Sequence, residues 1–178
     1  IRNSSASSDG ITLSSDGKVA FPNTSTGKVL QAVQVVKTSK QSVQSQTMVD
    51  ITGFELTITP SAASSKILLI TTITACCHSS GGFNLWRQIG SNSYSQLTTY
   101  IGDADGSRER YTMQMGQTQT ANVAERSMTI LDSPNTTSAV KYKWQTGTPY
   151  NSNYVIVINS TADDLSLIHI SEPTRPNT

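Results

Sequence analysis

The chain has 178 residues, of which 35% are hydrophobic and only 14% are charged, and its formal net charge is +1. This length suits one domain with a hydrophobic core plus an appendage. The weak charge gives no electrostatic basis for binding nucleic acid, and no apolar stretch is long enough to predict membrane insertion. Ser and Thr fill about 50 positions, and Val and Ile are plentiful, which favours β-strands over disorder.

The first element in chain order is a tandem repeat of Ser-Ser-Asp-Gly, at residues 7–10 and 14–17. Each copy places an Asp-Gly turn before a short alternating run, so we expect each unit to turn and then form one brief strand. Two such strands cannot bury a face alone and would gain stability by stacking on further repeats or on other chains, as in a fibre stalk. The alternative is a chance pair of turns in a linker. The turn-rich stretch 21–27 ends this stalk or linker, which spans residues 1–27.

From residue 28 onward, short apolar runs alternate with turn signals at the spacing typical of an all-β antiparallel sandwich or jelly roll. Residues 67–70 are apolar at both parities, which predicts a central strand covered on both faces. Trp86 and Trp144 are assigned to the core. No window carries a sustained apolar stripe of helical period, so helices are not predicted. The predicted strands span residues 29–36, 54–58, 66–75, 83–89, 94–100, 110–115, 124–131, 140–145 and 154–158, with a polar strand or loop at 42–50.

The C-terminal residues 166–178 are predicted to be foreign to the domain. The stretch SLIHISEPTR at 166–175 resembles the translation of a transposase adapter used to prepare sequencing libraries. We therefore assign the sandwich to residues 28–165 and expect a closing C-terminal strand to have been lost. The alternative is a genuine proline-bearing tail.

Several turn-and-strand phrases of the predicted domain are distinctive: GKVLQ at 27–31, ITG to ITPS at 51–61, SSKIL at 64–68, GDA at 102–104, GSR at 106–108 and LDSP at 131–134, preceded by GKVAFP at 17–22. Together they resemble, over about residues 28–160, a family of tail-fibre and virion structural proteins of marine phages. The family continues with a further strand that this sequence lacks.

The resemblance implies a jelly-roll head like those of complement C1q and tumour necrosis factor, assembled as a homotrimer. It implies a non-enzymatic virion protein without a cofactor, assembled in the host cytoplasm and displayed on the tail fibre. Its implied partners are other tail proteins and a glycan or protein of the host cell surface.

Candidate contact residues are three tyrosines beside loops rich in Ser, Asn or Gly: Tyr94, Tyr100 and Tyr150. We expect their rings to be exposed, because sugar faces stack on exposed aromatic rings. A separate charged stretch contains Asp103, Arg108 and Arg110. These three residues are candidates for ion pairs between protomers, and the alternative is that they are solvated.

Catalytic and metal-binding chemistry has weak support in the sequence. Cys76 and Cys77 are adjacent and should point to opposite faces of a strand, and no second pair at zinc spacing joins them and His78. The turn at 103–106 begins like a calcium loop but lacks the remaining ligands. A catalytic triad would have His78 as its one base candidate outside the C-terminal tail.

Paired carboxylates for glycoside cleavage are not evident either, because Glu55, Glu109 and Glu125 are predicted on separate strands. We therefore expect no enzyme activity. Two alternatives stay open: a glycan-degrading fibre domain, and a secreted cellular adhesin or lectin.

Overall fold

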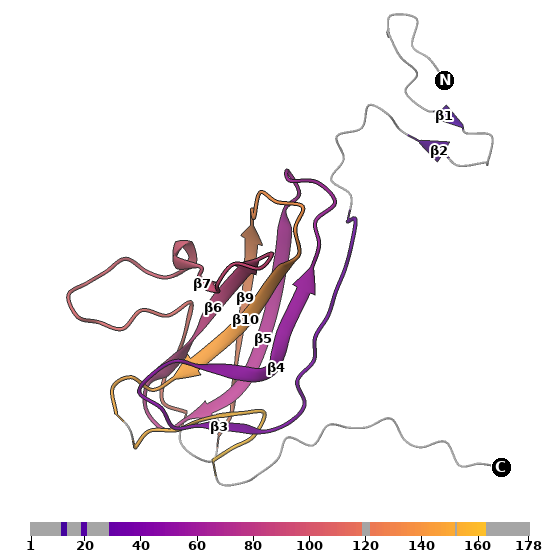
Figure 1. The fold of residues 1–178 in the computed structure, drawn as a ribbon. Coiled ribbons are helices and arrows are strands. Elements are labelled where there is room, and N and C mark those ends of the chain that lie inside the picture. Colours follow the sequence, from indigo (N-terminus) through magenta and orange to yellow (C-terminus); the bar gives the residue numbers. More distant parts are fainter. Residues whose placement is uncertain (1–11, 14–18, 21–28, 119–121, 152, 163–178) are drawn as a thin grey trace, which may run out of the picture. The chain divides into compact units, whose positions relative to one another are not determined.

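The computed structural model describes residues 12–13, 19–20, 29–118, 122–151 and 153–162 (Figure 1). The chain divides into two compact units, residues 1–32 and 33–178. In the first unit, β1 (Thr12–Leu13) pairs antiparallel with β2 (Val19–Ala20). A brief strand therefore follows each copy of the repeat, as predicted. The Asp-Gly turns and the adapter-like residues 166–178 lie outside the described residues.

The second unit is an antiparallel β-sandwich, which confirms the predicted fold class. Sheet I contains, in spatial order, β3 (Gln41–Val43), β11 (Ile156–Ile158), β5 (Ile67–Cys77) and β9 (Ala124–Asp132). Sheet II contains β4 (Val49–Ile58), β10 (Val140–Gly147) and β6 (Gly81–Ile89), and both β7 (Ser95–Gln96) and β8 (Met113–Met115) pair with the far side of β6. Figure 1 shows β4 and β10 in front of β5 and β9.

The chain passes repeatedly between the two sheets. β3, β5, β9 and β11 belong to sheet I, while β4, β6, β7, β8 and β10 belong to sheet II. This exchange, with all the pairings antiparallel, is the connectivity of a jelly-roll-like sandwich.

The core forms because inward positions alternate along each strand. On β6, Phe83 and Leu85 are fully buried, and on β10, Val140, Tyr142 and Trp144 face inward. The core assignment of Trp144 is therefore confirmed.

The core assignment of Trp86 is wrong. Phe83 and Leu85 occupy the inward parity of β6, so Trp86 faces outward, beside Lys143 on β10 and Gln96 on β7. Its indole nitrogen is nevertheless buried and has no hydrogen-bond partner among the described residues.

The strand predicted at residues 29–36 is also wrong. This segment belongs to neither sheet, and Val29, Leu30, Val33 and Val36 are exposed. Local β-propensity suits a strand, but a strand also needs a neighbour to accept its backbone hydrogen bonds. Within the predicted strand 94–100, residues 95 and 96 alone are extended in the sheet, and η1 (Thr98–Tyr100) is a 3-10 turn.

A bulge interrupts β4 at the edge of sheet II. Lys143 lies opposite Glu55, but Gln145 lies opposite Asp50, so the register shifts between these pairs. Gly53 has a φ of +74° there, a conformation that favours glycine. The side chain of Gln41, on sheet I, accepts a hydrogen bond from the Thr52 N–H and donates one to the Asp50 carbonyl.

Candidate functional site

The structure separates the three predicted contact tyrosines. Tyr94 is part-buried on the outside of sheet II, where its hydroxyl donates to Glu55 at 2.5 Å. Tyr100 is part-buried against the core, and its hydroxyl donates to the Leu131 carbonyl at 2.7 Å. Tyr150 is 53% exposed. Of the three rings, Tyr150 alone is exposed as predicted.

Tyr94 belongs to a polar network on sheet II. The Lys143 ammonium lies 4.2 Å from the centroid of the Tyr94 ring and 2.8 Å from Asp50, which also accepts a hydrogen bond from Gln145. Burial acts to raise the Asp50 pKa, but the hydrogen bonds from Lys143 and Gln145 outweigh it and lower the pKa. Burial, with the Glu55 hydrogen bond, raises the Tyr94 pKa. Each of these polar groups has a hydrogen-bond, ion-pair or cation–π partner within the network, so we interpret the network as one that stabilises the fold.

Tyr150 lies in the loop that connects β10 to β11, and a buried threonine fixes the backbone of that loop. The Thr148 N–H donates to the Ser45 carbonyl at 2.8 Å. The Thr148 hydroxyl lies 3.2–3.3 Å from the carbonyl oxygens of Ser45, Asn151 and Tyr154. A hydroxyl donates one hydrogen bond at a time, so any of these three oxygens can receive it. Tyr150 is therefore an exposed ring on a well-braced loop.

This loop lies at one end of the sandwich, which we term the far end. The far end also holds the β3–β4 loop at 44–48 and the β5–β6 turn at 78–80. His78 packs beside Tyr154 there, with ring centroids 5.5 Å apart. Gln41 pairs with Ile158, and Val43 pairs with Ile156, which lies opposite Cys77 at the end of β5. The chain therefore runs toward the far end as it enters the sandwich through β3.

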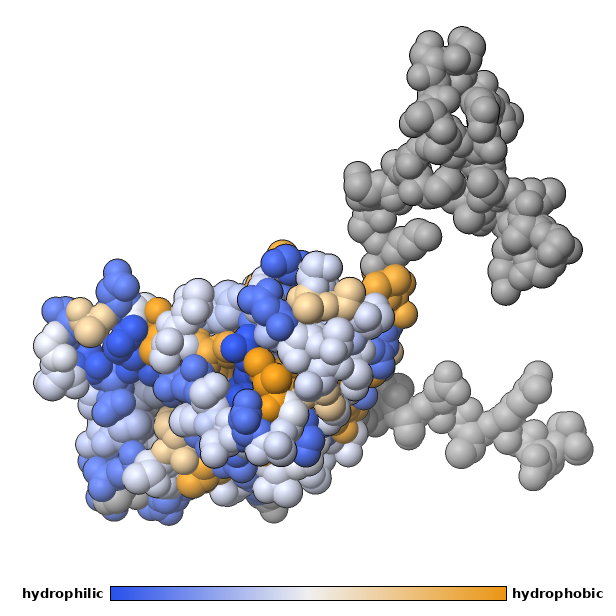
Figure 2. Space-filling view, turned by 45° about the horizontal axis from the view of Figure 1, so that its top comes forward, coloured by the Kyte–Doolittle hydropathy of each residue, from blue (hydrophilic) through white to orange (hydrophobic). Residues whose placement is uncertain are grey.

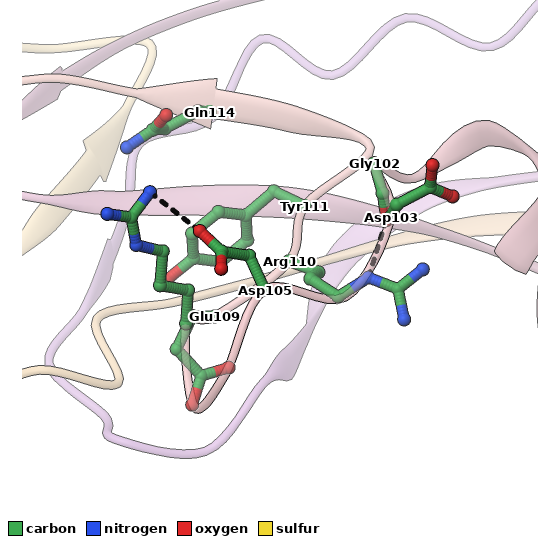
Figure 3. A pocket seen from close by; sticks show the side chains of 8 residues that line it. Gly102, Asp103, Asp105, Glu109, Arg110, Tyr111 and Gln114 are labelled. Carbon is green, nitrogen blue, oxygen red and sulfur yellow. Dashed lines mark hydrogen bonds and ion pairs between the residues drawn. The ribbon is translucent and has the colours of Figure 1, made fainter.

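The charged stretch lies on the long connection between η1 and β8 (Figure 3). Arg108 pairs with Asp105 at 3.2 Å, and the Arg110 Nε donates to the Gly102 carbonyl at 2.5 Å. Both members of the Arg108–Asp105 pair are highly exposed, so the pair contributes little stability. The predicted pairs of Asp103, Arg108 and Arg110 between protomers stay predictions.

The same connection borders an open pocket of about 250 Å³. In Figure 3 the carboxylates of Asp103, Asp105 and Glu109 point in different directions and do not converge on one point. The Tyr111 hydroxyl is buried without a hydrogen-bond partner in the described part of the chain, and burial raises its pKa. The pocket is lined by Gly102, Asp103, Asp105, Arg108, Glu109, Arg110, Tyr111 and Gln114.

The cysteines occupy opposite faces of β5. Cys77 belongs to the core, whereas Cys76 is buried on the outer side, opposite Val157 of β11. Both are free thiols, and burial raises the pKa of Cys77. Within residues 29–118, 122–151 and 153–162, no three His, Cys, Asp or Glu side chains gather as metal ligands would. Glu55 and Glu125 lie on different sheets.

The sequence prediction missed an apolar surface on the outside of sheet I. Leu68, Ile70 and Leu131 are 58%, 74% and 56% exposed, and Leu68 lies directly opposite Leu131. We name six outward residues of these two strands the β5–β9 face: Leu68, Ile70, Thr72, Ser127, Thr129 and Leu131. Thr74 and Glu125 continue the same side beyond Thr72 and Ser127. The prediction that β5 is covered on both faces is therefore wrong for this single chain, because sheet II covers one side only. The signal available in the sequence was the run at 67–70, in which the residues that point to either side of the strand are all apolar.

Figure 2 shows the hydropathy of one side of the molecule. There, hydrophilic residues surround apolar residues that gather in small separate groups. An isolated exposed apolar side chain is common on soluble proteins, whereas three on neighbouring strands form a patch.

Comparison with known proteins gave no assignment. No protein-family model matches the sequence, and no curated protein is significantly similar to it. In the described residues, no helix has the length and apolar composition needed to cross a bilayer.

Proposed function

We propose that this chain is a structural, non-enzymatic protein of a phage virion. It forms the distal domain of a tail fibre, assembles as a homotrimer and contacts the surface of the host cell. The observation that carries this proposal is the direction of the chain. The chain runs toward the far end through β3, and the exposed Tyr150 lies at that end, near the hydrogen bonds of Thr148. An adhesive domain at the tip of a fibre would hold its contact residues on loops at one end of the sandwich.

The N-terminal part of the chain supports assembly with identical chains. β1 and β2 form a ladder of two residues each, and an isolated two-stranded hairpin is marginally stable in water. Several apolar side chains of residues 29–36 are exposed as well. Equivalent segments of other copies would supply the missing neighbours. The jelly-roll-like connectivity accords with the C1q-like and tumour-necrosis-factor-like heads that the sequence resembles.

Tyr150 supports adhesion because it offers an exposed aromatic ring two residues from Thr148, whose hydrogen bonds hold the neighbouring backbone. Pre-ordering reduces the entropic cost of association. Tyrosine is also enriched among residues that dominate binding energy. We assign host contact to the far end, with Tyr150 as its first anchor.

The location in a virion is tested directly with an antibody raised against residues 33–162. Immunogold electron microscopy of tailed phage particles that carry the gene should label the distal end of the tail. Labelling confined to bacterial envelopes would instead support a secreted cellular adhesin and overturn the proposal.

The adhesive role is tested by adsorption of the same phage to its host. A Tyr150→Ala variant should slow adsorption by about tenfold or more, as expected for loss of an aromatic anchor. The matched control is Tyr94→Phe, which removes the hydroxyl of a ring engaged by Glu55 and Lys143. Equal adsorption by wild type and Tyr150→Ala would remove Tyr150 from the contact surface.

A further inference from the structure

The β5–β9 face is unusual because a regular, well-formed surface of the sandwich has no cover. β5 and β9 pair without a register shift from Ile67 opposite Asp132 to Ala75 opposite Ala124. Their outward side chains therefore stand in an even array, as sheet-to-sheet packing requires. Leu68, Ile70 and Leu131 lie together toward one end of this array, each more than half exposed.

We propose that the β5–β9 face is the surface through which copies of this chain contact one another. Leu68, Ile70 and Leu131 of one copy become buried against a second copy. The inference rests on the proposed homo-oligomeric function and deepens it by naming the contact surface on the sandwich. Burial of apolar area is the main favourable contribution to such association.

The charge pattern of the face suits a second copy of the same chain. The six residues of the β5–β9 face are uncharged, and Glu125, on the same side of β9, accepts a hydrogen bond from the Ser127 hydroxyl at 3.2 Å. Glu125 lies at the end away from Leu68 and Leu131, so two copies that meet at the apolar end bring no like charges together there. Thr72 and Ser127 form a hydroxyl pair at 3.0 Å between them, which leaves neither hydroxyl unpaired. Lys66, beyond the apolar end, directs its ammonium to the Ser133 hydroxyl at 2.8 Å.

A second observation also favours an identical partner over an unrelated one. The same chain exposes apolar side chains in residues 29–36, a segment separate in sequence from β5 and β9. Assembly of identical chains can bury both surfaces in one event. A different partner protein would have to match each of them independently.

The test measures the mass of the full chain in solution by light scattering coupled to size exclusion. The double variant Ile70→Glu with Leu131→Glu places two carboxylates on the β5–β9 face. We expect wild type to be oligomeric and the variant to dissociate, with a dissociation constant at least about 100-fold higher. The control is Thr57→Glu, an exposed strand position on the outside of sheet II, opposite Lys141, which should assemble as wild type does.

Crosslinking provides a second measurement that does not depend on a disruptive variant. Because Cys76 and Cys77 are buried, an Ile70→Cys chain has one exposed thiol among its described residues. A short bismaleimide should crosslink this chain between copies, whereas a Thr57→Cys chain should remain uncrosslinked.

The outcomes separate the two proposals. If wild type is oligomeric but Ile70→Glu with Leu131→Glu leaves its mass unchanged and Ile70→Cys does not crosslink, the face is wrong and the homo-oligomer stands. A monomeric wild-type chain would overturn both. A variant that loses its near-ultraviolet circular dichroism has unfolded, and the crosslinking result then decides.

Discussion

Arg87 of β6 and Asp132 of β9 form an ion pair that joins the two sheets, with 2.8 Å between Arg87 Nη1 and Asp132 Oδ1. Tyr142, on β10, donates to the same carboxylate at 2.6 Å, and the Ser133 N–H adds a further bond at 2.9 Å. Burial and the Asp132 hydrogen bond raise the Tyr142 pKa, so its hydroxyl stays a donor at physiological pH. The carboxylate is thus satisfied from both sheets.

Removing this carboxylate should be costly. Asp132 is 7% exposed, and Asp132→Ala would leave the Arg87 charge without its partner, so the free energy of unfolding should fall by about 3 kcal/mol. Urea denaturation measures the change. The control is Asp105→Ala, which breaks an exposed ion pair and should cost less than about 0.5 kcal/mol. Similar losses in the two variants would show that the cross-sheet pair adds no special stability.

Gly82 should not tolerate a side chain. A Cβ at this position would lie 2.3 Å from Cγ of Tyr111, whose ring covers the strand there. Gly82→Ala should therefore reduce the free energy of unfolding by about 1–3 kcal/mol, because the ring must move from its packed position. Gly102→Ala is the matched control, since nothing lies within 4 Å of its Cβ. Thermal unfolding of both variants gives the comparison; a Gly82→Ala midpoint equal to that of wild type contradicts the packing.

The far-end loop should lose its bracing in Thr148→Val. Valine keeps the shape of threonine but removes the hydroxyl, so the free energy of unfolding should fall by about 1 kcal/mol. The Tyr154 amide, which donates to the Asn151 carbonyl, should then exchange faster with deuterium. Thr137→Val, at an exposed position in the β9–β10 loop, should leave that exchange unchanged. Unchanged exchange in Thr148→Val would mean that the loop is ordered by other contacts.

The Asp50–Lys143 pair should make the free energy of unfolding depend on pH in the acid range. The folded-state pKa of Asp50 lies below its ordinary value of 3.8, so its contribution is present above that pH and is lost as pH falls through the folded pKa. Lys143→Met should reduce the difference in unfolding free energy between pH 7 and pH 3, by roughly 0.5 kcal/mol because Asp50 is exposed. Urea titrations at the two pH values measure it. An undiminished difference would assign the acid sensitivity to other carboxylates.

Most of the sandwich was predictable because its long strands alternate clearly. Along β6, Phe83 and Leu85 face the core while Asn84 and Trp86 face outward, as period-two patterning requires. The short strands were less visible, since β3 and β7 have three and two residues and no complete period. Residues 29–36 show the opposite case, in which the pattern of a strand occurs without a neighbour.

The functional surface was less predictable, because exposure depends on distant partners. Tyr94 and Tyr100 adjoin polar loops, yet their hydroxyls reach Glu55 and Leu131, which are 39 and 31 residues away in the chain. The run at 67–70 predicted cover on both sides of the strand, but Leu68 and Ile70 are exposed. Its two apolar parities indicate two buried faces, and one chain supplies only one of them.

The bulge in β4 also affects whether copies of the chain can aggregate through this edge of sheet II. β4 is an edge strand of sheet II, and unpaired strand edges are the usual templates for uncontrolled sheet extension and fibril growth. Its register break, Gly53 and the Gln41 hydrogen bonds leave no continuous row of free backbone groups along this edge. This edge is thereby protected from aggregation by strand addition, which matters most where copies of the chain are concentrated.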